Sequence, residues 1–485
     1  MSENGIKLKS KNDKIKSIIK KRLETSSIIV FLHLFQNELK IVKYFWVVCF
    51  LLSSSWCSWF IVRSISDYMN YNVVTKTIIK HKTGLRFPVI GICNLNPFLT
   101  DHSRYFLKTA FKTETPDQKH YFKAIRYANY FNGTVSKSRF DRRKMGQNLS
   151  EFILACSFAY FNCDLEQDFE YYYDSKYGNC YRYNSGRNMK GEPIAQKKVY
   201  TSGVYSAFDI EFFIGSALTN SFPFAIENGI VIFISNETID SNYNEGIKLL
   251  TGTSTRIILS SFTVKRQPKP YSECTNDLTS IDSYHSDTFK QTIRLLNKNS
   301  QYHYNNCFLT CYQKYLAQNC QCQTTSYGLF YNDSMKRCVI GENDTIDHDD
   351  DNCDTQFWKE FIRNLDYILK CDCPVECETN GYNYKKSQSE FPSKKYADYL
   401  LEKNDLVKQK LGNSSQQDMK KNVAKLKIFF DEMVQTAISE DPKTQLADLI
   451  SNVGGTMGLF LGISFLSLIE LVEILIKILL LIEKN

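Results

Sequence analysis

The chain has 485 residues, of which 43% are hydrophobic, and it carries 16 cysteines and a formal net charge of +8. Length alone allows several domains, but two apolar segments divide the chain more firmly than length does. The positive charge lies mostly in the N-terminal tail and in a lysine-rich central region. In a chain with membrane segments this favours contact with anionic lipid and solvent, and excludes nucleic acid as the expected partner.

Residues 1–43 contain ten lysines or arginines against four acidic residues, and residues 44–62, "YFWVVCFLLSSSWCSWFIV", contain no charge. These 19 residues are close to the ~20 needed to cross a ~30 Å hydrocarbon core. Because positive flanks stay inside, we predict a cytosolic N-terminal segment over residues 1–43 and a first transmembrane helix over residues 44–62. The start is too polar for a cleaved signal peptide. Cys49 and Cys57 lie in this span as small apolar side chains.

A second apolar stretch lies near the other end of the chain. Residues 453–469 carry no charge, and few charges follow up to residue 482. We therefore predict a second transmembrane helix over residues 446–482, which returns residues 483–485 to the cytosol. The protein is then a two-pass protein of the plasma membrane with both termini cytosolic, and residues 63–445 form an extracellular domain.

Two independent features of residues 63–445 support this topology. Fourteen of the 16 cysteines fall there, and such a dense, even set predicts disulfides in an oxidising compartment. All six N-x-[ST] glycosylation sequons fall there too. The sequon asparagines are Asn132, Asn148, Asn236, Asn332, Asn343 and Asn413.

Two groups of cysteines have matching spacings. Cys307 and Cys311 are four residues apart in a helical pattern, which places them about 6 Å apart along the axis. Cys371 and Cys373 are two residues apart on what we expect to be an extended chain, which separates them by about 6.6 Å. A ladder of two rungs, Cys307–Cys373 and Cys311–Cys371, is therefore geometrically possible. The nesting can be extended with Cys274–Cys377, Cys320–Cys353 and Cys322–Cys338. Zinc is the alternative for the C-x-C spacings, but it is disfavoured outside the cell, so we expect no metal site.

Three motifs resemble the degenerin/epithelial sodium channel/acid-sensing ion channel family. They are "FPVIGICNLNPF" at residues 87–98, "YGNCYRYNSG" at residues 177–186 and "GGTMGLFLGISFLSLIEL" at residues 454–471. With two spans and fourteen cysteines in the family's order, the resemblance covers nearly the whole chain. It implies an α+β membrane protein, in which two transmembrane helices flank a large disulfide-rich extracellular domain with a β-sheet core and peripheral helices. Cysteine-laddered, thumb-like helices are expected at about residues 274–377, with further family pairs Cys93–Cys180 and Cys156–Cys163.

The resemblance also implies a homotrimer or heterotrimer whose second helices line a cation pore. Ser451, Gly455, Gly458 and Gly462 are spaced to share one helix face, either for close helix packing or for lining a narrow pore. Ser451 matches the position whose enlargement holds degenerin channels open. Ser451, Gly455 and Gly458 are thus the expected gate positions.

The tract Gly462-Ile463-Ser464 matches the family's G-x-S selectivity filter, where the helix is expected to break and expose backbone carbonyls. Ile463 is larger than the alanine or serine more usual there. The resemblance therefore does not fix the preference for sodium over potassium, or the calcium permeability.

Three acidic residues could attract cations to such a pore, Glu470 and Glu473 at the inner mouth and Asp448 at the outer mouth. For Glu473 and Asp448 the sequence also offers a structural role. Glu473 could pair with Lys477 within the helix. Asp448 could cap the helix or interact with its dipole.

Two further matches concern gating. Tyr71 and Tyr271 match the aromatic pair that couples the extracellular domain to the pore, with Tyr in place of the usual Trp at the second position. Ile29-Val30 stands where many family members carry His-Gly, so this subunit is expected to gate unusually or to need partner subunits. Asn72-Val73 stands where proton-gated relatives carry two histidines, which makes proton gating less expected.

The function expected from these features is a subunit of a trimeric, amiloride-sensitive, sodium-conducting channel opened by an extracellular neuropeptide of the RFamide type. Proton gating, mechanical gating and constitutive opening are the alternatives within the family. An ATP-gated-type channel should lack the G-x-S tract and the segment at residues 87–98, and no H-E-x-x-H or G-x-S-x-G motif supports an ectoenzyme. We therefore expect no enzyme activity and no cofactor besides permeant Na⁺. The expected partners are homologous subunits, membrane lipid and the peptide.

Overall fold

A computed structural model of the chain describes residues 39–111, 124–129, 141–215, 226–236, 246–275, 286–296, 302–326, 335–338, 348–412 and 415–462, and positions 464, 467, 469, 472, 473 and 476. The chain divides into two compact units. The first comprises Met1–Thr75 with Glu440–Asn485, and the second comprises Lys76–Ser439.

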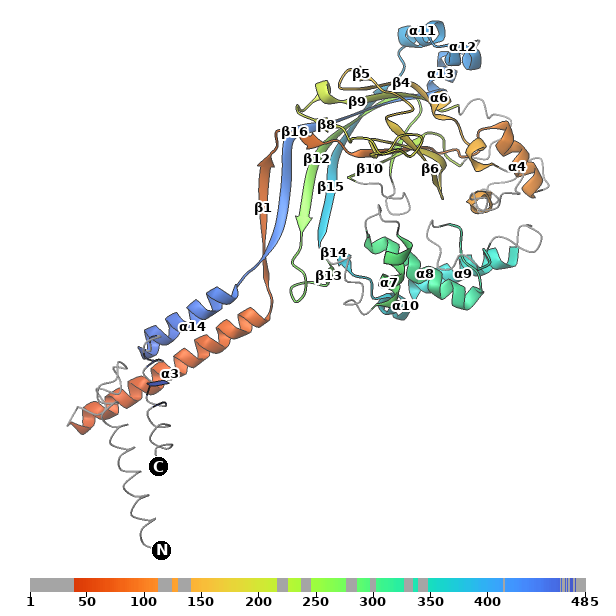
Figure 1. Ribbon diagram of the computed structural model, residues 1–485. Helices are drawn as coiled ribbons and strands as arrows, with labels where there is room; N and C mark the ends of the chain where they lie inside the picture. Colours follow the sequence, from red (N-terminus) through yellow and green to blue (C-terminus); the bar gives the residue numbers. More distant parts are fainter. Residues whose placement is uncertain are drawn as a thin grey trace. The chain divides into compact units, whose positions relative to one another are not determined.

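Two apolar helices lie side by side in the first unit, α3 (Lys40–Met69) and α14 (Leu446–Leu461) (Figure 1). Within the described residues, α3 is the one helix long and apolar enough to cross a membrane, and α14 is shorter. The rings of Phe60 and Phe460 stack between the two helices with their centroids 5.8 Å apart. Cys57 is 2% exposed, which fits the small apolar role expected of it.

The helix bounds differ from the predicted spans. α3 begins four residues before and ends seven residues after residues 44–62, because Lys43 and Arg63 limit the apolar run but do not end a helix. α14 stops at Leu461, because Gly462 adopts a left-handed backbone conformation. This is the place within residues 446–482 where the G-x-S tract predicts a break. The second compact unit, Lys76–Ser439, is correspondingly narrower than the predicted extracellular range of residues 63–445.

The larger sheet of the second unit contains seven strands. Their order is β15–β12–β16–β9–β4–β5, with β1 paired to β16. The bounds are β1 Val73–His81, β4 Ile153–Phe158, β5 Phe161–Asn162, β9 Phe208–Phe213, β12 Thr253–Lys265, β15 Glu378–Glu390 and β16 Val423–Pro442. β12 is parallel to β16 and antiparallel to β15. It buries every second residue from Thr255 to Thr263, the pattern of a strand with one face on a core.

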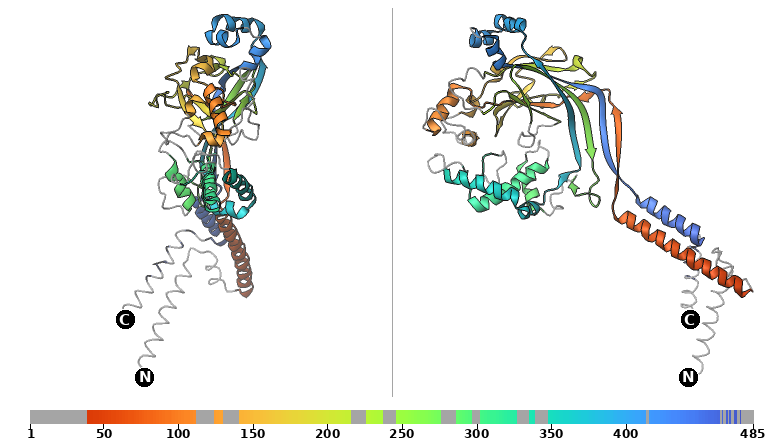
Figure 2. Two further views of the ribbon diagram at one scale, coloured as in Figure 1. Left: turned by 90° about the vertical axis from the view of Figure 1, so that its right-hand side faces the viewer. Right: turned by 180° about the vertical axis from the view of Figure 1, so that it is seen from behind.

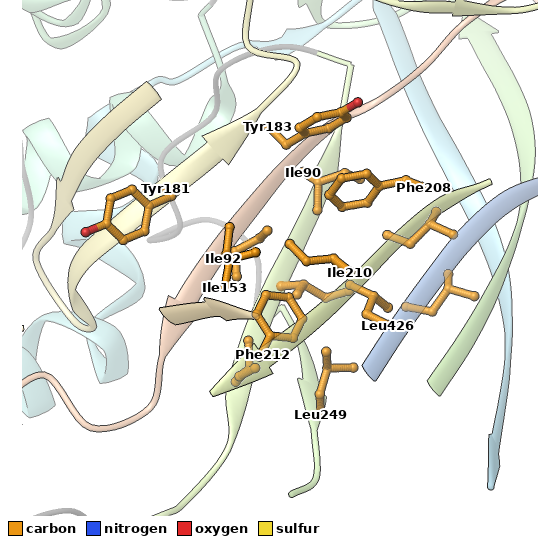
Figure 3. Packing of buried hydrophobic residues seen from close by; sticks show 14 of the residues in the cluster. Ile90, Ile92, Ile153, Tyr181, Tyr183, Phe208, Ile210, Phe212, Leu249 and Leu426 are labelled. Atoms are coloured by element: carbon orange, nitrogen blue, oxygen red, sulfur yellow. The ribbon is translucent and has the colours of Figure 1, made fainter. Parts of the chain in front are cut away.

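A smaller sheet of five antiparallel strands has the order β11–β10–β3–β7–β6. Its bounds are β3 Val89–Asn94, β6 Phe169–Asp174, β7 Gly178–Tyr183, β10 Ile230–Ser235 and β11 Ile247–Leu249. Side chains of this sheet, such as Ile90 and Tyr183, pack with Phe208 and Leu426 of the larger sheet in one buried cluster (Figure 3). The expected β-sheet core is therefore a core shared by two sheets.

Short elements complete the second unit. They are β2 Leu85–Arg86 paired with β8 Lys198–Val199, β13 Cys274–Thr275 paired with β14 Val375–Glu376, α4 Asp101–Phe111, α6 Leu149–Phe152, and the 3-10 helices η1 Arg142–Lys144 and η2 Val204–Ser206. Three helices, α11 Lys394–Lys403, α12 Asp405–Leu411 and α13 Gln416–Asn422, gather at one end of the larger sheet (Figure 2). They share a second hydrophobic cluster with Phe213 and Val423 of β9 and β16.

Four helices carry the cysteine-rich region, namely α7 Asp287–Leu295, α8 Tyr304–Cys320, α9 His348–Arg363 and α10 Leu365–Cys371. Seven disulfides are present, and they join the same pairs that the spacings and the resemblance suggested: Cys93–Cys180, Cys156–Cys163, Cys274–Cys377, Cys307–Cys373, Cys311–Cys371, Cys320–Cys353 and Cys322–Cys338. Five of them staple the segments at about residues 274–377 to one another. This region is therefore the cysteine-laddered element that was predicted.

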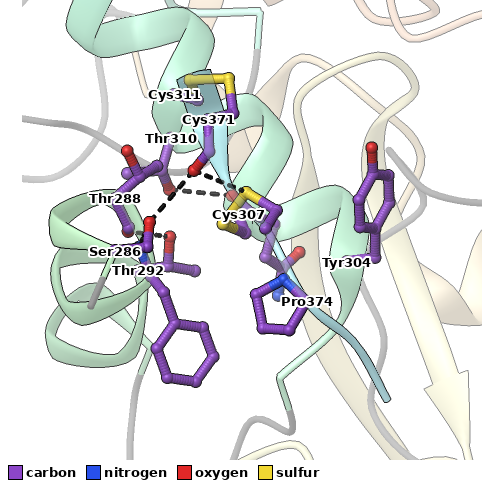
Figure 4. The surroundings of a disulfide bond; sticks show 12 residues. Ser286, Thr288, Thr292, Tyr304, Cys307, Thr310, Cys311, Cys371 and Pro374 are labelled. Atoms are coloured by element: carbon purple, nitrogen blue, oxygen red, sulfur yellow. Dashed lines mark hydrogen bonds between the residues drawn. A yellow bond between two sulfur atoms is a disulfide. The ribbon is translucent and has the colours of Figure 1, made fainter. Parts of the chain in front are cut away.

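One expectation about this ladder was wrong. Cys371 is the last residue of α10 and Asp372 is left-handed with φ 46°, so the chain there is not extended. The turn after the helix still presents both cysteines to α8, with Cα separations of 5.8 Å for Cys307–Cys373 and 5.6 Å for Cys311–Cys371. Ser286 secures the turn, because its hydroxyl donates to the Cys371 carbonyl at 3.1 Å (Figure 4).

Candidate functional site

The second apolar helix, α14, begins at a carboxylate cap. The Gln445 amide donates to the Asp448 carboxylate at 3.0 Å, which satisfies one of the four N–H groups that a helix start leaves without partners. Of the two roles that the sequence left open for Asp448, this contact supports the cap. Nearby, the Lys443 amide donates to the Asn72 carbonyl at 2.8 Å, so the chain entering α14 is tied to the chain leaving α3.

Small residues line one face of α14. Ser451, Gly455, Gly458 and Gly462 are all exposed in the single chain, whereas Val453, Met457 and Phe460 are partly buried. A Cβ atom added to Gly455 or Gly462 would meet no described atom within 4 Å. The small face therefore does not pack against α3, and it is open to other chains or to a pore.

The helix ends where the G-x-S tract begins. Gly462 has φ 66° and ψ 19°, and its amide donates to the Gly458 carbonyl at 3.1 Å. Such a left-handed residue closes a helix and disfavours any side chain larger than glycine. A left-handed residue in this place ends the run of intrahelical hydrogen bonds, which leaves the last carbonyls of a helix to other partners.

A pair of serines follows the break. The Ser464 amide donates to the Ser467 hydroxyl at 3.2 Å, the Ser467 amide donates to the Ser464 hydroxyl at 3.3 Å, and the two hydroxyl oxygens are 3.2 Å apart. Ser467, Ile469, Val472, Glu473 and Ile476 are helical. Sequence reasoning missed Ser467. The S-x-x-S spacing was the available signal, but the usual capping box ends in Glu or Gln.

The charged inner end of the segment is described only in part. Glu473 is helical and half-buried. Ile463, Glu470 and Lys477 lie outside the described residues, as does the Ile29-Val30 pair. The cation-attracting roles of the two glutamates, and the alternative pair of Glu473 with Lys477, remain predictions.

The two tyrosines matched to gating lie in different units. Tyr71 follows α3 with φ 48°, and its amide donates to the Tyr68 carbonyl at 3.2 Å. Tyr271 is half-buried in the segment between β12 and β13, where its amide donates to the Pro268 carbonyl at 3.1 Å. Their coupling role remains a prediction.

Two of the six sequon asparagines can be placed. Asn148 is exposed and precedes α6, with no hydrogen bond from its side chain to the helix end. Asn236 is partly buried, and its carboxamide oxygen accepts a hydrogen bond from the Tyr382 hydroxyl. Asn132, Asn332, Asn343 and Asn413 fall outside the described part of the chain. Among the described residues, no group of three His, Cys, Asp or Glu side chains could hold a metal ion.

Comparison with known proteins agrees with the resemblance. The chain is 26% identical to acid-sensing ion channel 1 of Gallus gallus over 470 residues, covering 91% of this chain and 80% of the relative. It is 25% identical to the bile acid-sensitive ion channel of Homo sapiens, covering 91% and 82%. It is 21% identical to the FMRFamide-activated amiloride-sensitive sodium channel of Cornu aspersum, covering 85% and 75%.

These relatives differ in what their names give as the stimulus, so they do not resolve how this chain is gated. They agree in being channels, which is also what the family profile describes. The profile named amiloride-sensitive sodium channel matches residues 23–474, nearly the whole chain. This chain therefore belongs to the amiloride-sensitive sodium channel family, whose members are ion channels and not enzymes.

Proposed function

We propose that this chain is one subunit of a trimeric sodium channel of the plasma membrane and that an extracellular neuropeptide opens it. Each subunit crosses the membrane twice, with α3 and with the segment that begins at α14, and both termini are cytosolic. Three copies of α14 surround the pore, with Ser451, Gly455 and Gly458 facing the axis. Gly462, Ile463 and Ser464 form the selectivity filter below them.

The observation that carries this proposal is the small-residue face of α14 and its end at Gly462. Four small residues are exposed on the side of α14 that does not meet α3, although the helix is apolar. Lipid-facing positions have no need of small side chains, but three helices that approach one axis do. A helix break in a membrane segment is tolerated where it lines a cavity or is buried in protein, and its carbonyls can replace the hydration shell of a cation.

Two observations support the choice of a peptide as the stimulus. A peptide-activated channel is among the relatives, and Asn72 and Val73 occupy the positions where proton-gated relatives carry two histidines. Asn72 contributes its backbone carbonyl to the link with Lys443. An asparagine side chain has no charge to gain or lose near neutral pH, so this junction lacks the titrating groups that histidines would supply.

Expression in oocytes tests the proposal. We expect an inward, amiloride-blocked sodium current when RFamide peptides are applied to this subunit, alone or together with related subunits. Silence with every peptide and every partner, but current at low pH, would overturn the peptide stimulus and favour a proton-gated channel. Absence of any cation current under peptide, acid, stretch and resting conditions would contradict the channel function of this chain.

Sequon mapping tests the topology separately. Asn148 is exposed and its side chain is not used by the helix that it precedes, so a glycan there should not disturb the fold. We expect Asn148→Gln to increase the mobility of the full chain on a denaturing gel, and glycosidase treatment to abolish the difference. An unchanged mobility would contradict glycosylation at Asn148.

A further inference from the structure

The two serines after the helix break form a closed pair. Each backbone amide donates to the hydroxyl of the other residue, at 3.2 Å from Ser464 and 3.3 Å from Ser467. The hydroxyl oxygens are themselves 3.2 Å apart, so one donates to the other. This is the reciprocal geometry of a capping box, in which the first residue caps the new helix and the third residue after it holds the first.

Burial makes hydrogen bonds necessary for the second serine. Ser467 is only 1% exposed, whereas Ser464 is exposed. A buried hydroxyl in an apolar segment costs free energy unless it is hydrogen-bonded, and the Ser464 contacts help to meet this need. A glutamate, the usual residue at this place in a capping box, would add three charges near the constriction of a trimer. Serine caps without charge.

We propose that Ser467 is a positioning residue of the selectivity filter, acting through Ser464. This inference rests on the proposed function. The pair caps the start of the inner helix two residues after Gly462. A hydroxyl has one donor and two acceptor sites, and the Ser464 hydroxyl uses two of these three on the amide and the hydroxyl of Ser467. In this arrangement backbone carbonyls coordinate the permeant ions, and the serine pair sets where those carbonyls lie.

The permeability of full-length channels tests the role of Ser467. The permeability ratios among Na⁺, Li⁺ and K⁺ are taken from reversal potentials. We expect Ser467→Ala and Ser464→Ala each to change at least one ratio threefold or more. In the double variant the permeability ratios should change by no more than in the single variant with the larger change, because the two hydroxyls act as one unit. Ser467→Thr keeps the hydroxyl and should stay within twofold of the wild type.

The matched control removes another hydroxyl of the same unit. Thr456 donates to the Asn452 carbonyl at 2.6 Å within α14 and takes no part in the break. Thr456→Ala should leave the ratios within twofold of the wild type. A merely structural role for Ser467 would lower current amplitude and surface expression without moving the ratios. Unchanged ratios in Ser467→Ala would therefore overturn the proposal.

Hydrogen–deuterium exchange tests the cap without any current. In the full chain reconstituted in lipid nanodiscs, Ser464→Ala should speed exchange at the Ser467 amide, and Ser467→Ala should speed it at the Ser464 amide. Unchanged exchange at both amides would overturn the reciprocal cap. A wild-type chain that passes no cation current would contradict the proposed function instead, and the exchange measurement would still decide the cap.

Discussion

Tyr183 is fully buried, yet its hydroxyl has no hydrogen-bond partner among the described residues. Its ring stacks on Phe208 with centroids 4.1 Å apart, so the side chain is held by packing. An unsatisfied buried hydroxyl costs roughly 1–3 kcal/mol. We expect Tyr183→Phe to raise the free energy of unfolding of the full chain by about 1 kcal/mol, seen as a higher thermal unfolding midpoint.

The matched control for this change is Tyr181, two residues earlier on the same strand. Its hydroxyl donates to the Gln147 carbonyl at 2.8 Å, and Tyr181→Phe therefore leaves a carbonyl without its donor. We expect this variant to lower the unfolding midpoint. Equal shifts of the same sign in the two variants would contradict the account of the Tyr183 hydroxyl.

Ser451 carries the residue-scale prediction about the gate. The side chain is exposed on the small face of α14, and a phenylalanine there would hold neighbouring helices apart near the proposed axis. We expect Ser451→Phe to increase the standing, amiloride-blocked current several-fold over the wild type in oocytes.

The control lies one residue away and about 100° around the helix. Ile450 is 64% exposed, so Ile450→Phe adds bulk at an exposed position off the small face. We expect no rise in its standing current. If both variants, or neither, raised the current, Ser451 would not be distinguished as the gate position.

At the scale of elements, the two neighbouring disulfides that join α8 to the end of α10 and to the turn after it should act cooperatively. While Cys311–Cys371 is intact, breaking Cys307–Cys373 opens a loop of only about six residues. In the chain-entropy model this lowers the free energy of unfolding by about 2 kcal/mol. Breaking the second disulfide as well opens a loop of several tens of residues, and this lowers the free energy of unfolding by a further ~4 kcal/mol. We expect the double removal to lower the thermal unfolding midpoint by more than the sum of the two single removals.

A disulfide elsewhere in the domain serves as the comparison. Cys156–Cys163 closes the short β4–β5 hairpin and shares no loop with the two rungs. Its removal together with Cys307–Cys373 should be additive within error. Additivity between the two rungs themselves would contradict the nested-loop account.

How far the elements could be predicted depends on the range of the interactions that form them. Cys307 and Cys311 could be matched to Cys371 and Cys373 because spacing along a helix is a local property. The left-handed turn at Asp372 could not, since an aspartate rarely signals that conformation. The period of alternating burial in β12 is visible in its sequence, but its parallel register with β16 is not, because register depends on residues far away in the chain.

The contact between β9, β16 and α11 shows the same limit. Glu211 is buried, accepts a hydrogen bond from the Tyr396 hydroxyl at 2.9 Å and pairs with Lys425 at 2.8 Å. Burial would lower the pKa of Lys425, but Glu211 and Asp209 outweigh it and raise the pKa above its ordinary value. These partners lie up to 214 residues apart, so a single sequence carries no signal of this network.

For the whole molecule, buried tyrosines predict a loss of stability in alkali. Burial raises the pKa of Tyr173, Tyr181, Tyr183 and Tyr382 above the ordinary value of 10.0. Above about pH 10 the unfolded chain loses these protons and the folded chain keeps them, so stability falls as pH rises. Each group contributes a slope of about 1.4 kcal/mol per pH unit there.

We expect the thermal unfolding midpoint of the full chain to fall steeply between about pH 9.5 and about pH 11. This range brackets the ordinary tyrosine pKa of about 10, where tyrosines of the unfolded chain begin to lose their protons. Tyr183→Phe should lessen the fall, because one group no longer titrates. Tyr160 is 73% exposed, and Tyr160→Phe should leave the fall unchanged. A midpoint independent of pH over this range would contradict the account.

The family and the disulfide pairs were the most predictable features of the whole molecule. They depend on two apolar runs, the order of the cysteines and the pore motif, and none of these changes when the bounds of a helix or strand are misjudged. The pairing of Ser464 with Ser467 was less visible, because the chemistry of a cap appears only once the helix is known to break at Gly462. The stimulus has no such local signature.

The length of α3 has a consequence for the lipid around it. Thirty residues make a rod of about 45 Å, whereas the hydrocarbon layer is about 30 Å thick. The surplus turns carry Arg63, whose guanidinium lies 5.6 Å from the Trp59 ring, a pairing suited to the headgroup region. If α3 spans the bilayer as proposed, the lipid boundary falls within the helix. A thicker bilayer would then draw Arg63 toward hydrocarbon unless the rod stood more upright, so this anchor would limit how far the helix can tilt.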